Sequence, residues 1–249
     1  MSFKKILIAA SLVIATAGAN ATIIQVGSET SLQTIIDNIT VGGPSSVNVN
    51  TDQASPDEIW ANTDSGISPI RFVAEIAGQA SVNTFGIYDP NNIANFFEIF
   101  SGAHSNGELS TFGLDTDGSV FALSGGGFTD TGIDFSGTTF GFYIGTPTTK
   151  FYSEVSKNGP GGDDQMVAFQ GTSTDTIDLP GFGGPALWTE GGWLLAFEDR
   201  LYSGSDKDFN DMVIFIESAR PVPEPTTLAL LGLGLAGLGF ARRRKNNAK

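Results

Sequence analysis

The chain has 249 residues, with 27 acidic and 13 basic residues and no cysteine. The lack of cysteine excludes disulfides, a thiol nucleophile, Cys-based zinc sites and iron–sulfur ligation, so the fold must be held by an apolar core, by bound metal or by both. The stretch from Thr22 to Pro221 carries 6 basic against 26 acidic residues, a net charge of −20. This charge argues against nucleic acid and anionic membrane surfaces as partners, because both attract basic patches.

The N-terminus has the three parts of a secretory signal peptide. Lys4 and Lys5 form a basic region, and residues 6–17 form an apolar run. Small side chains at Ala19 and Ala21 then mark a cleavage site. A buried N-terminal helix would not explain this order. We therefore predict a signal peptide over residues 1–21, which signal peptidase removes after Ala21 during export.

Residues 22–221 are predicted to form one exported domain, because about 200 residues suffice for a single sizeable core. Its first element is a short helix. Four apolar residues, Leu32, Ile35, Ile36 and Ile39, fall on one helical face. Ser31 is placed to cap the helix start, and two glycines at 42–43 follow its end. We expect this helix to close one end of the domain.

The rest of the domain is rich in short apolar runs with turn residues between them, which is typical of β-strands. The pattern predicts a mainly β fold, a single antiparallel β-sandwich of jelly-roll-like form. The eight candidate strands are residues 71–77, 84–88, 96–100, 119–123, 139–144, 165–169, 193–197 and 212–217.

The connection between the last two predicted strands is the most acidic part of the domain. It is predicted to be a hairpin turn, and its clustered oxygen-bearing side chains are hard ligands of the kind that Ca²⁺ takes. With no cysteine and a single histidine, a transition metal fits less well. The six candidate ligands are Glu198, Asp199, Asp206, Asp208, Asn210 and Asp211.

An alternative for this hairpin is a solvated acidic turn, in which Asp and Asn bond nearby backbone N–H groups. Like charges on one turn repel each other unless a cation, or Arg200 and Lys207, compensates them. The spacing Asp206-x-Asp208-x-Asn210 also matches the first three ligand positions of an EF-hand, but no helices flank it, so any ligands come from a β-hairpin. Two further acidic turns, at 115–117 and 163–164, are interpreted as plain turns and loops, and His104 as a surface residue.

Two function classes remain open for the domain. The first is a non-enzymatic surface or matrix protein, including a carbohydrate-binding module. The second is a glycan hydrolase with paired carboxylates, although no nucleophile elbow, HExxH or P-loop motif is present. Trp60, Trp188, Trp193 and the tyrosines could stack on sugars, but most of these aromatic residues are interpreted as core. Trp193 lies in an apolar strand run, whereas Trp188, among glycine, proline and polar residues, is the better candidate for exposure.

The C-terminus, residues 222–249, combines three features in a fixed order. Pro223-Glu224-Pro225 precedes an apolar run at 226–241, and a basic cluster, 242–245, follows it. As a helix the run would measure about 24 Å, shorter than the bilayer core of about 30 Å, and its glycines weaken it further. We expect a transient transmembrane helix with the basic cluster on the cytoplasmic side.

This arrangement resembles the PEP-CTERM sorting signal of Gram-negative bacterial proteins. Pro223, Glu224 and Pro225 match its signature, and Arg242, Arg243 and Arg244 match its basic end. The resemblance implies processing by exosortase, a membrane transpeptidase, in bacteria that make extracellular polysaccharide. It further implies transient anchoring in the inner membrane and a final place at the cell surface or in the extracellular matrix, with polysaccharide as an expected partner.

A second resemblance covers the acidic hairpin. Residues 196–199, the small linker 203–205 and the run 206–211 are similar to DUF4114, a domain of exported bacterial proteins, with residues 193–217 as the most specific part. This family implies a β-rich fold of unassigned activity.

Overall fold

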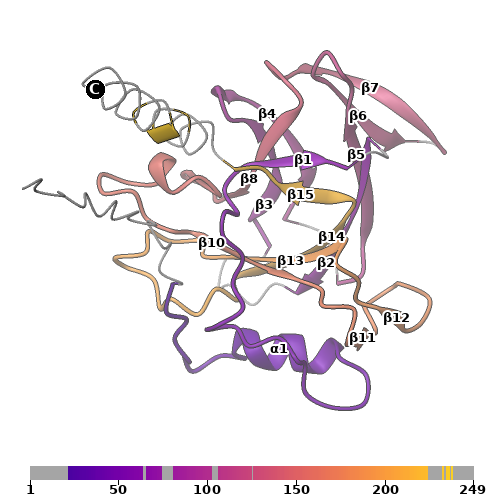
Figure 1. Ribbon diagram of the computed structural model, residues 1–249, viewed down its shortest axis with the longest axis vertical. Coiled ribbons are helices and arrows are strands. Elements are labelled where there is room, and N and C mark those ends of the chain that lie inside the picture. Colours follow the sequence, from indigo (N-terminus) through magenta and orange to yellow (C-terminus); the bar gives the residue numbers. More distant parts are fainter. Residues whose placement is uncertain are drawn as a thin grey trace, which may run out of the picture.

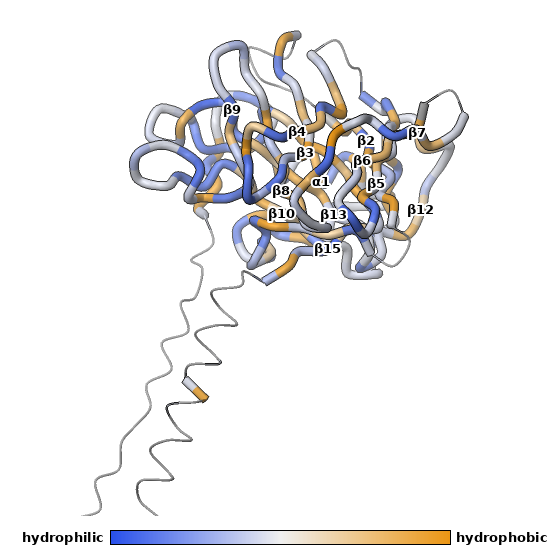
Figure 2. The backbone as a smooth tube through the Cα atoms, turned by 90° about the horizontal axis from the view of Figure 1, so that it is seen from above, coloured by the Kyte–Doolittle hydropathy of each residue, from blue (hydrophilic) through white to orange (hydrophobic). Residues whose placement is uncertain are grey.

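The computed structural model describes residues 22–63, 66–74, 81–102, 106–124 and 126–223, together with Gly232, Gly234, Leu235 and Gly237. The domain is an antiparallel sandwich of two sheets with one short α-helix (Figure 1). The predicted fold class is confirmed. In Figure 2 the apolar stretches, in orange, run through the sheets, while the polar stretches occupy peripheral loops.

One sheet has the order β15-β1-β8-β3-β4, with β9 also paired to β8. The other has the order β10-β13-β14-β2-β5-β6-β7, and β11 pairs with β12 in a small third sheet. The strands of the first sheet are β1 (Trp60–Asn62), β3 (Thr84–Asp89), β4 (Asn92–Phe100), β8 (Thr139–Gly145), β9 (Lys150–Tyr152) and β15 (Ala219–Pro221). Those of the second are β2 (Ile67–Ala74), β5 (Leu109–Leu114), β6 (Ser119–Ser124), β7 (Gly127–Asp134), β10 (Met166–Gln170), β13 (Gly192–Phe197) and β14 (Met212–Glu217). The remaining elements are α1 (Leu32–Ile39), η1 (Val155–Lys157), β11 (Thr176–Ile177) and β12 (Ala186–Leu187).

An aromatic core fills the space between the two large sheets. Trp60 of β1 contacts Phe142 of β8 and Trp193 of β13 edge to face, with ring centroids 5.5 and 5.1 Å apart. Such edge-to-face pairs add to the stabilisation from burial alone. Both tryptophans are buried, so the prediction that they belong to the core is confirmed.

Helix α1 covers the outer face of the seven-stranded sheet. Its four apolar residues pack against alternate residues of β10, β13 and β14, among them Phe169, Leu194 and Phe215. The expectation that the helix closes one end of the sandwich was therefore wrong. The central strands are covered on both faces, which explains why β13 is apolar at every position rather than at alternate ones.

Trp188 is buried, with only 1% of its surface exposed, so the prediction of an exposed, sugar-stacking indole was wrong. Its ring nitrogen donates to the Gly192 carbonyl at 3.0 Å. A Cβ at Gly171 would lie 2.3 Å from the indole. A Cβ at Gly192, one of the neighbouring glycines that suggest an exposed loop in the sequence, would lie 3.2 Å from it, so Gly171 and Gly192 make room for the ring.

The outermost segments lie largely beyond the described residues. The predicted signal peptide with Ala19 and Ala21 falls outside them, and so do Glu224, Pro225 and Arg242 to Arg244. The four described residues between 232 and 237 are helical. Within the described part of the chain, no helix is both long and apolar enough to cross a membrane.

Candidate metal centre and sorting motif

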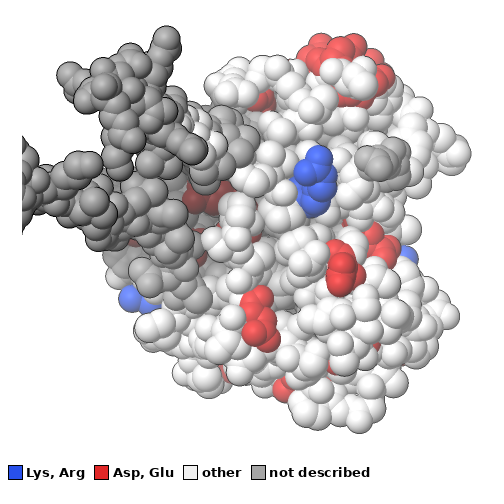
Figure 3. Space-filling model, in the orientation of Figure 1, with Lys and Arg blue, Asp and Glu red and all other residues white. Residues whose placement is uncertain are grey.

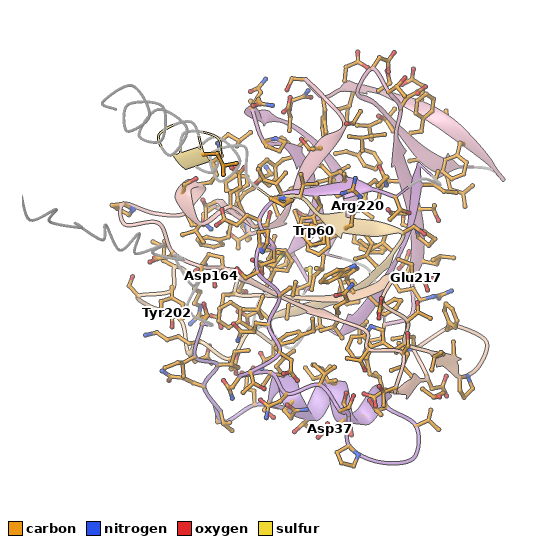
Figure 4. The ribbon with its side chains drawn as sticks, in the orientation of Figure 1. Asp37, Trp60, Asp164, Tyr202, Glu217 and Arg220 are labelled. Carbon is orange, nitrogen blue, oxygen red and sulfur yellow. The ribbon has the colours of Figure 1, made fainter. Side chains whose placement is uncertain are left out.

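The acidic segment is the connection of a β-hairpin, as predicted. Strands β13 and β14 pair in register from Gly192 with Glu217 to Phe197 with Met212. The connecting loop, residues 198–211, leaves the sheet at the end where Tyr202 lies beside Asp164 (Figure 4). The loop therefore begins with an acid, Glu198, directly after a fully buried strand.

Three carboxylates of this loop converge on one point. Oxygen atoms of Glu198, Asp206 and Asp208 all lie within 4.8 Å of one another. Glu198 is 0% exposed and Asp208 is 1% exposed, whereas Asp206 lies at the surface. These three residues are called the acidic cluster below. Burying two carboxylates side by side costs free energy unless something compensates their charge.

One oxygen of the cluster has no protein partner. Glu198 Oε1 accepts a hydrogen bond from the Phe209 N–H at 2.8 Å. Glu198 Oε2 is also buried but has no hydrogen-bond partner among the described residues. The hydroxyl of Ser205 lies near enough to Glu198 to lower the pKa of that carboxyl, and it donates to the Tyr202 carbonyl at 3.5 Å. Buried carboxylate oxygens are normally paired, so Oε2 can accept one more bond.

Asn210, next to the cluster, resembles Glu198 in having one side-chain oxygen that is buried without a partner among the described residues. Its Nδ2 donates to Asp208 Oδ2 and to the Thr30 carbonyl, both at 2.8 Å. Its Oδ1 is buried without a partner among the residues described. A second free acceptor therefore lies next to the cluster.

The other two predicted ligands, Asp199 and Asp211, form a separate network with protein donors. Asp211 Oδ2 accepts from the Asp199 N–H at 2.8 Å. Asp199 Oδ2 accepts from Asn83 at 3.0 Å, and its Oδ1 lies 3.8 Å from Arg200 Nε. Lys207 is turned away, with its ammonium 4.5 Å from the Tyr202 ring centroid. Of the two cations expected to compensate the loop, only Arg200 contacts one of its acids in a described ion pair.

The loop owes its shape to a buried anchor. Phe209 is 0% exposed and packs in the core between α1 and the seven-stranded sheet. Its ring centroid lies 6.4 Å from that of Tyr202. Phe209 and Lys207 have positive φ values of 52° and 64°. This conformation is uncommon for side chains other than glycine and persists only where the surroundings impose it. The anchor turns both flanking residues, Asp208 and Asn210, toward the interior.

Residues 25–30, near the start of the domain, complete the site. Their contact with the loop cannot be predicted from the sequence. The Gln25 N–H donates to the Lys207 carbonyl at 2.8 Å, and Thr30 accepts from Asn210. Gly27 approaches so closely that a Cβ there would lie 3.0 Å from Asp208 Oδ2. Residues 25–30 therefore lie over the acidic loop from 180 positions away in the sequence.

Burial, together with neighbouring negative charges, raises the pKa values of Glu198, Asp208 and Asp211. Burial raises the pKa of Glu198, and the charges of Asp208 and Asp206 add to the rise. Burial and the charge of Asp206 likewise raise the pKa of Asp208. Burial, followed by the charges of Asp199, Glu198 and Asp208, raises the pKa of Asp211 to about 8. The loop thus holds more negative charge than the protein itself compensates.

The remaining acidic turns differ from this loop. Asp117 accepts from the Ser119 N–H at 3.2 Å, and Gly118 supplies the φ of 97° that the turn requires. Asp164 accepts from Thr22 and from the Met166 N–H. His104 lies outside the described residues. Acids are spread over the face seen in Figure 3 with few basic residues, yet among the described residues only the acidic cluster brings three potential metal ligands together.

The last strand leads directly into the C-terminal signal. Strand β15 ends at Pro221, and the Val222 N–H still donates to the Ile59 carbonyl at 2.7 Å. A family model described as the PEP-CTERM protein-sorting motif matches residues 221–245. The chain carries a PEP-CTERM sorting motif. This motif marks the protein for export and for processing by exosortase on its way toward the cell surface.

A second family model, described as a domain of unknown function (DUF4114), matches residues 135–219. The DUF4114 match runs from β8 to the first residue of β15 and includes the whole loop that bears the acidic cluster. Comparison with curated proteins and with solved structures finds no match to the chain.

Proposed function

We propose that this PEP-CTERM protein is a non-enzymatic component of the cell surface or extracellular matrix whose β-sandwich binds Ca²⁺ at the acidic cluster. The observation that carries the proposal is Glu198 Oε2, a buried carboxylate oxygen without a partner among the described residues, in a cluster with Asp206 and Asp208. A cation there would satisfy that oxygen and offset the burial and the mutual repulsion that raise the pKa values of Glu198 and Asp208.

The donor set suits calcium in particular. Ca²⁺ takes six to eight oxygen ligands at about 2.3–2.6 Å, so two ligands on opposite sides of the ion lie about 4.8 Å apart. The oxygens of the cluster fall within 4.8 Å of one another. The Oδ1 of Asn210 offers a further neutral oxygen, and water at the exposed side of Asp206 can complete the coordination. Mg²⁺ demands stricter octahedral geometry and gives up its water reluctantly.

Calorimetric titration of the processed protein with CaCl₂ tests this assignment. We expect one Ca²⁺ per chain, with a dissociation constant of about 0.1–1 mM, as is usual for extracellular modules. Asp206→Asn should weaken binding at least tenfold, because it removes one of three negative charges while the exposed site tolerates the amide. Asp117→Asn, in an ordinary turn, is the matched control and should bind as the wild type does. The absence of heat beyond dilution would rule out the site.

The environment of the cluster favours ion binding over catalysis. Two of its three carboxylates are buried, and the N-terminal segment lies over them at Gly27. A glycosidase needs two carboxyl groups that flank an open cleft wide enough for a sugar ring. The hydrolase alternative therefore gains no support from this loop.

An association with polysaccharide finds its best support in a groove at the edge of the seven-stranded sheet. This groove, of about 330 Å³, is lined by Ile67, Leu114, Asp115, Phe121 and Phe128 together with two glycines. Phe128 is 45% exposed on the edge strand β7. An exposed aromatic ring beside a carboxylate offers a stacking surface and a hydrogen-bond acceptor for a sugar.

Phe128→Ala should therefore reduce co-sedimentation of the protein with the host's extracellular polysaccharide at least threefold, without a change in melting temperature. Phe182→Ala is a suitable control, because Phe182 is also exposed, at 36%, but lies outside this groove. Equal retention of both variants would leave the groove without a role in polysaccharide binding.

A further inference from the structure

Strand β15 places the start of the sorting motif inside the folded sheet. Its residues pair with β1 in the register Asn62 with Ala219, Ala61 with Arg220, and Trp60 with Pro221 (Figure 1). The Val222 N–H donates to the Ile59 carbonyl beyond the end of the strand. Only Pro223 therefore separates the last residue bonded to the sheet from Glu224 of the motif.

The hydrogen bonds show which edge of this strand faces β1. The Ser218 carbonyl accepts from Thr63 N–H at 2.8 Å, and the Val222 N–H donates at 2.7 Å. In an antiparallel pair the main-chain groups of alternate residues point to the same edge. Residues 218, 220 and 222 therefore face β1, while 219 and 221 face away from it.

The prolines of the motif follow the same alternation. They stand at 221, 223 and 225 in the sequence, so among residues 220–223 only Arg220 and Val222 have a main-chain N–H. Proline has no N–H to donate. The outward edge is thus without donors at residues 221–223, which also protects this edge strand from pairing with another chain. The main-chain N–H groups of Arg220 and Val222, to which another strand could bond, lie on one edge of the segment. That edge already faces β1.

We propose that β15 exchanges partners during sorting: it leaves β1, and exosortase then binds residues 220–222, directly before the motif, through the same edge. Enzymes and receptors that read an extended peptide through its main chain do so by adding a strand to it. Here the added strand must replace β1, because the opposite edge carries prolines. Processing is therefore limited by release of β15 from the folded domain.

The strand is built for such a release. It is three residues long, lies at the end of its sheet and contains a proline. Arg220 is exposed on the surface (Figure 4), and Ala219 is its only fully buried side chain. Detaching it therefore exposes little apolar surface, while the aromatic core around Trp60 keeps its contacts with β8 and β13.

A reversible lock between the two strands tests the exchange. Ala61 and Arg220 are direct partners, and Cα atoms in such a hydrogen-bonded pair lie about 5.5 Å apart, within the range that a disulfide spans. The chain has no cysteine, so the double variant A61C/R220C forms a single disulfide after export. We expect conversion of the precursor to the processed form, followed by gel mobility in the native host, to fall at least tenfold and to recover when reductant is added.

Three controls separate this inference from the sorting function itself. Each single variant, A61C or R220C, cannot form the disulfide, so its rate of processing should not change when reductant is added. Insertion of Gly-Ser-Gly between Val222 and Pro223 should restore processing of the locked variant, because the inserted residues then supply unpaired main-chain donors next to the motif in place of those of Arg220 and Val222. Processing of the oxidised lock at the wild-type rate would overturn the strand exchange alone. A wild-type precursor of unchanged size, with or without exosortase, would contradict the sorting function and the exchange with it.

Discussion

Calcium is expected to raise the melting temperature of the processed protein by about 3–11 °C. A ligand at ten to a hundred times its dissociation constant stabilises the folded state by about 1.4–2.7 kcal/mol. For a domain of about 200 residues, each kcal/mol corresponds to about 2–4 °C. The stabilisation arises because the ion binds the carboxylates of Glu198, Asp206 and Asp208 only where the fold brings them within 4.8 Å. Differential scanning calorimetry with 10 mM CaCl₂ against EGTA measures it.

Charge-removing variants distinguish a cation site from an acidic turn held by its own hydrogen bonds. In EGTA, Asp206→Asn should melt above the wild type, since it relieves repulsion within the cluster, and it should lose most of the calcium response. Glu198→Gln should lose the response as well. If the acids served only as hydrogen-bond acceptors, the calcium-free variants would melt at or below the wild-type temperature. The same amount of MgCl₂ should give a much smaller shift, and an equal response to both ions would contradict a calcium site.

The sequence predicts elements whose residues are neighbours along the chain. All eight predicted strands correspond to strands of the structure, because alternating or continuous apolar residues show which faces are buried. Strand β7, Gly127–Asp134, is not predicted from this pattern, because it is an exposed edge strand with polar and glycine residues at most positions. Strands β1 and β15 are not predicted either, because both are short and β15 contains a proline.

Long-range contacts limit how much of the candidate site can be predicted from the sequence. The hairpin loop and its acids are contiguous, so their clustering is visible in the sequence. The roles of Gly27 and Thr30 are not, because these residues reach the loop from the opposite end of the domain. Nor does spacing show that Asp211 accepts from the Asp199 N–H while Asp206 and Asp208 converge with Glu198. The place of α1 on a sheet face likewise depends on which strands the helix covers.

Without calcium, the stability of the protein should fall as the pH rises from about 5 to about 8. An unfolded aspartate releases its proton near pH 3.9, whereas burial and the charges of Asp199, Glu198 and Asp208 raise the pKa of Asp211 in the folded protein to about 8. Between these values the folded state binds the proton more tightly, so deprotonation at higher pH favours unfolding. The raised pKa values of Glu198 and Asp208 act in the same direction.

Thermal melts in EGTA at pH 5, 6.5 and 8 should therefore show a decrease of about 7–14 °C across the series, because the proton of Asp211 alone accounts for about 3.6 kcal/mol between pH 5 and pH 8. Asp211→Asn should flatten this dependence, because its amide can still accept from the Asp199 N–H without a charge. Calcium should have its largest effect at pH 8, since the ion competes with protons for the same carboxylates. A wild-type protein whose calcium-free stability rises toward pH 8 would show that the crowded loop acids are already compensated within the protein, and calcium would then have no excess charge to neutralise.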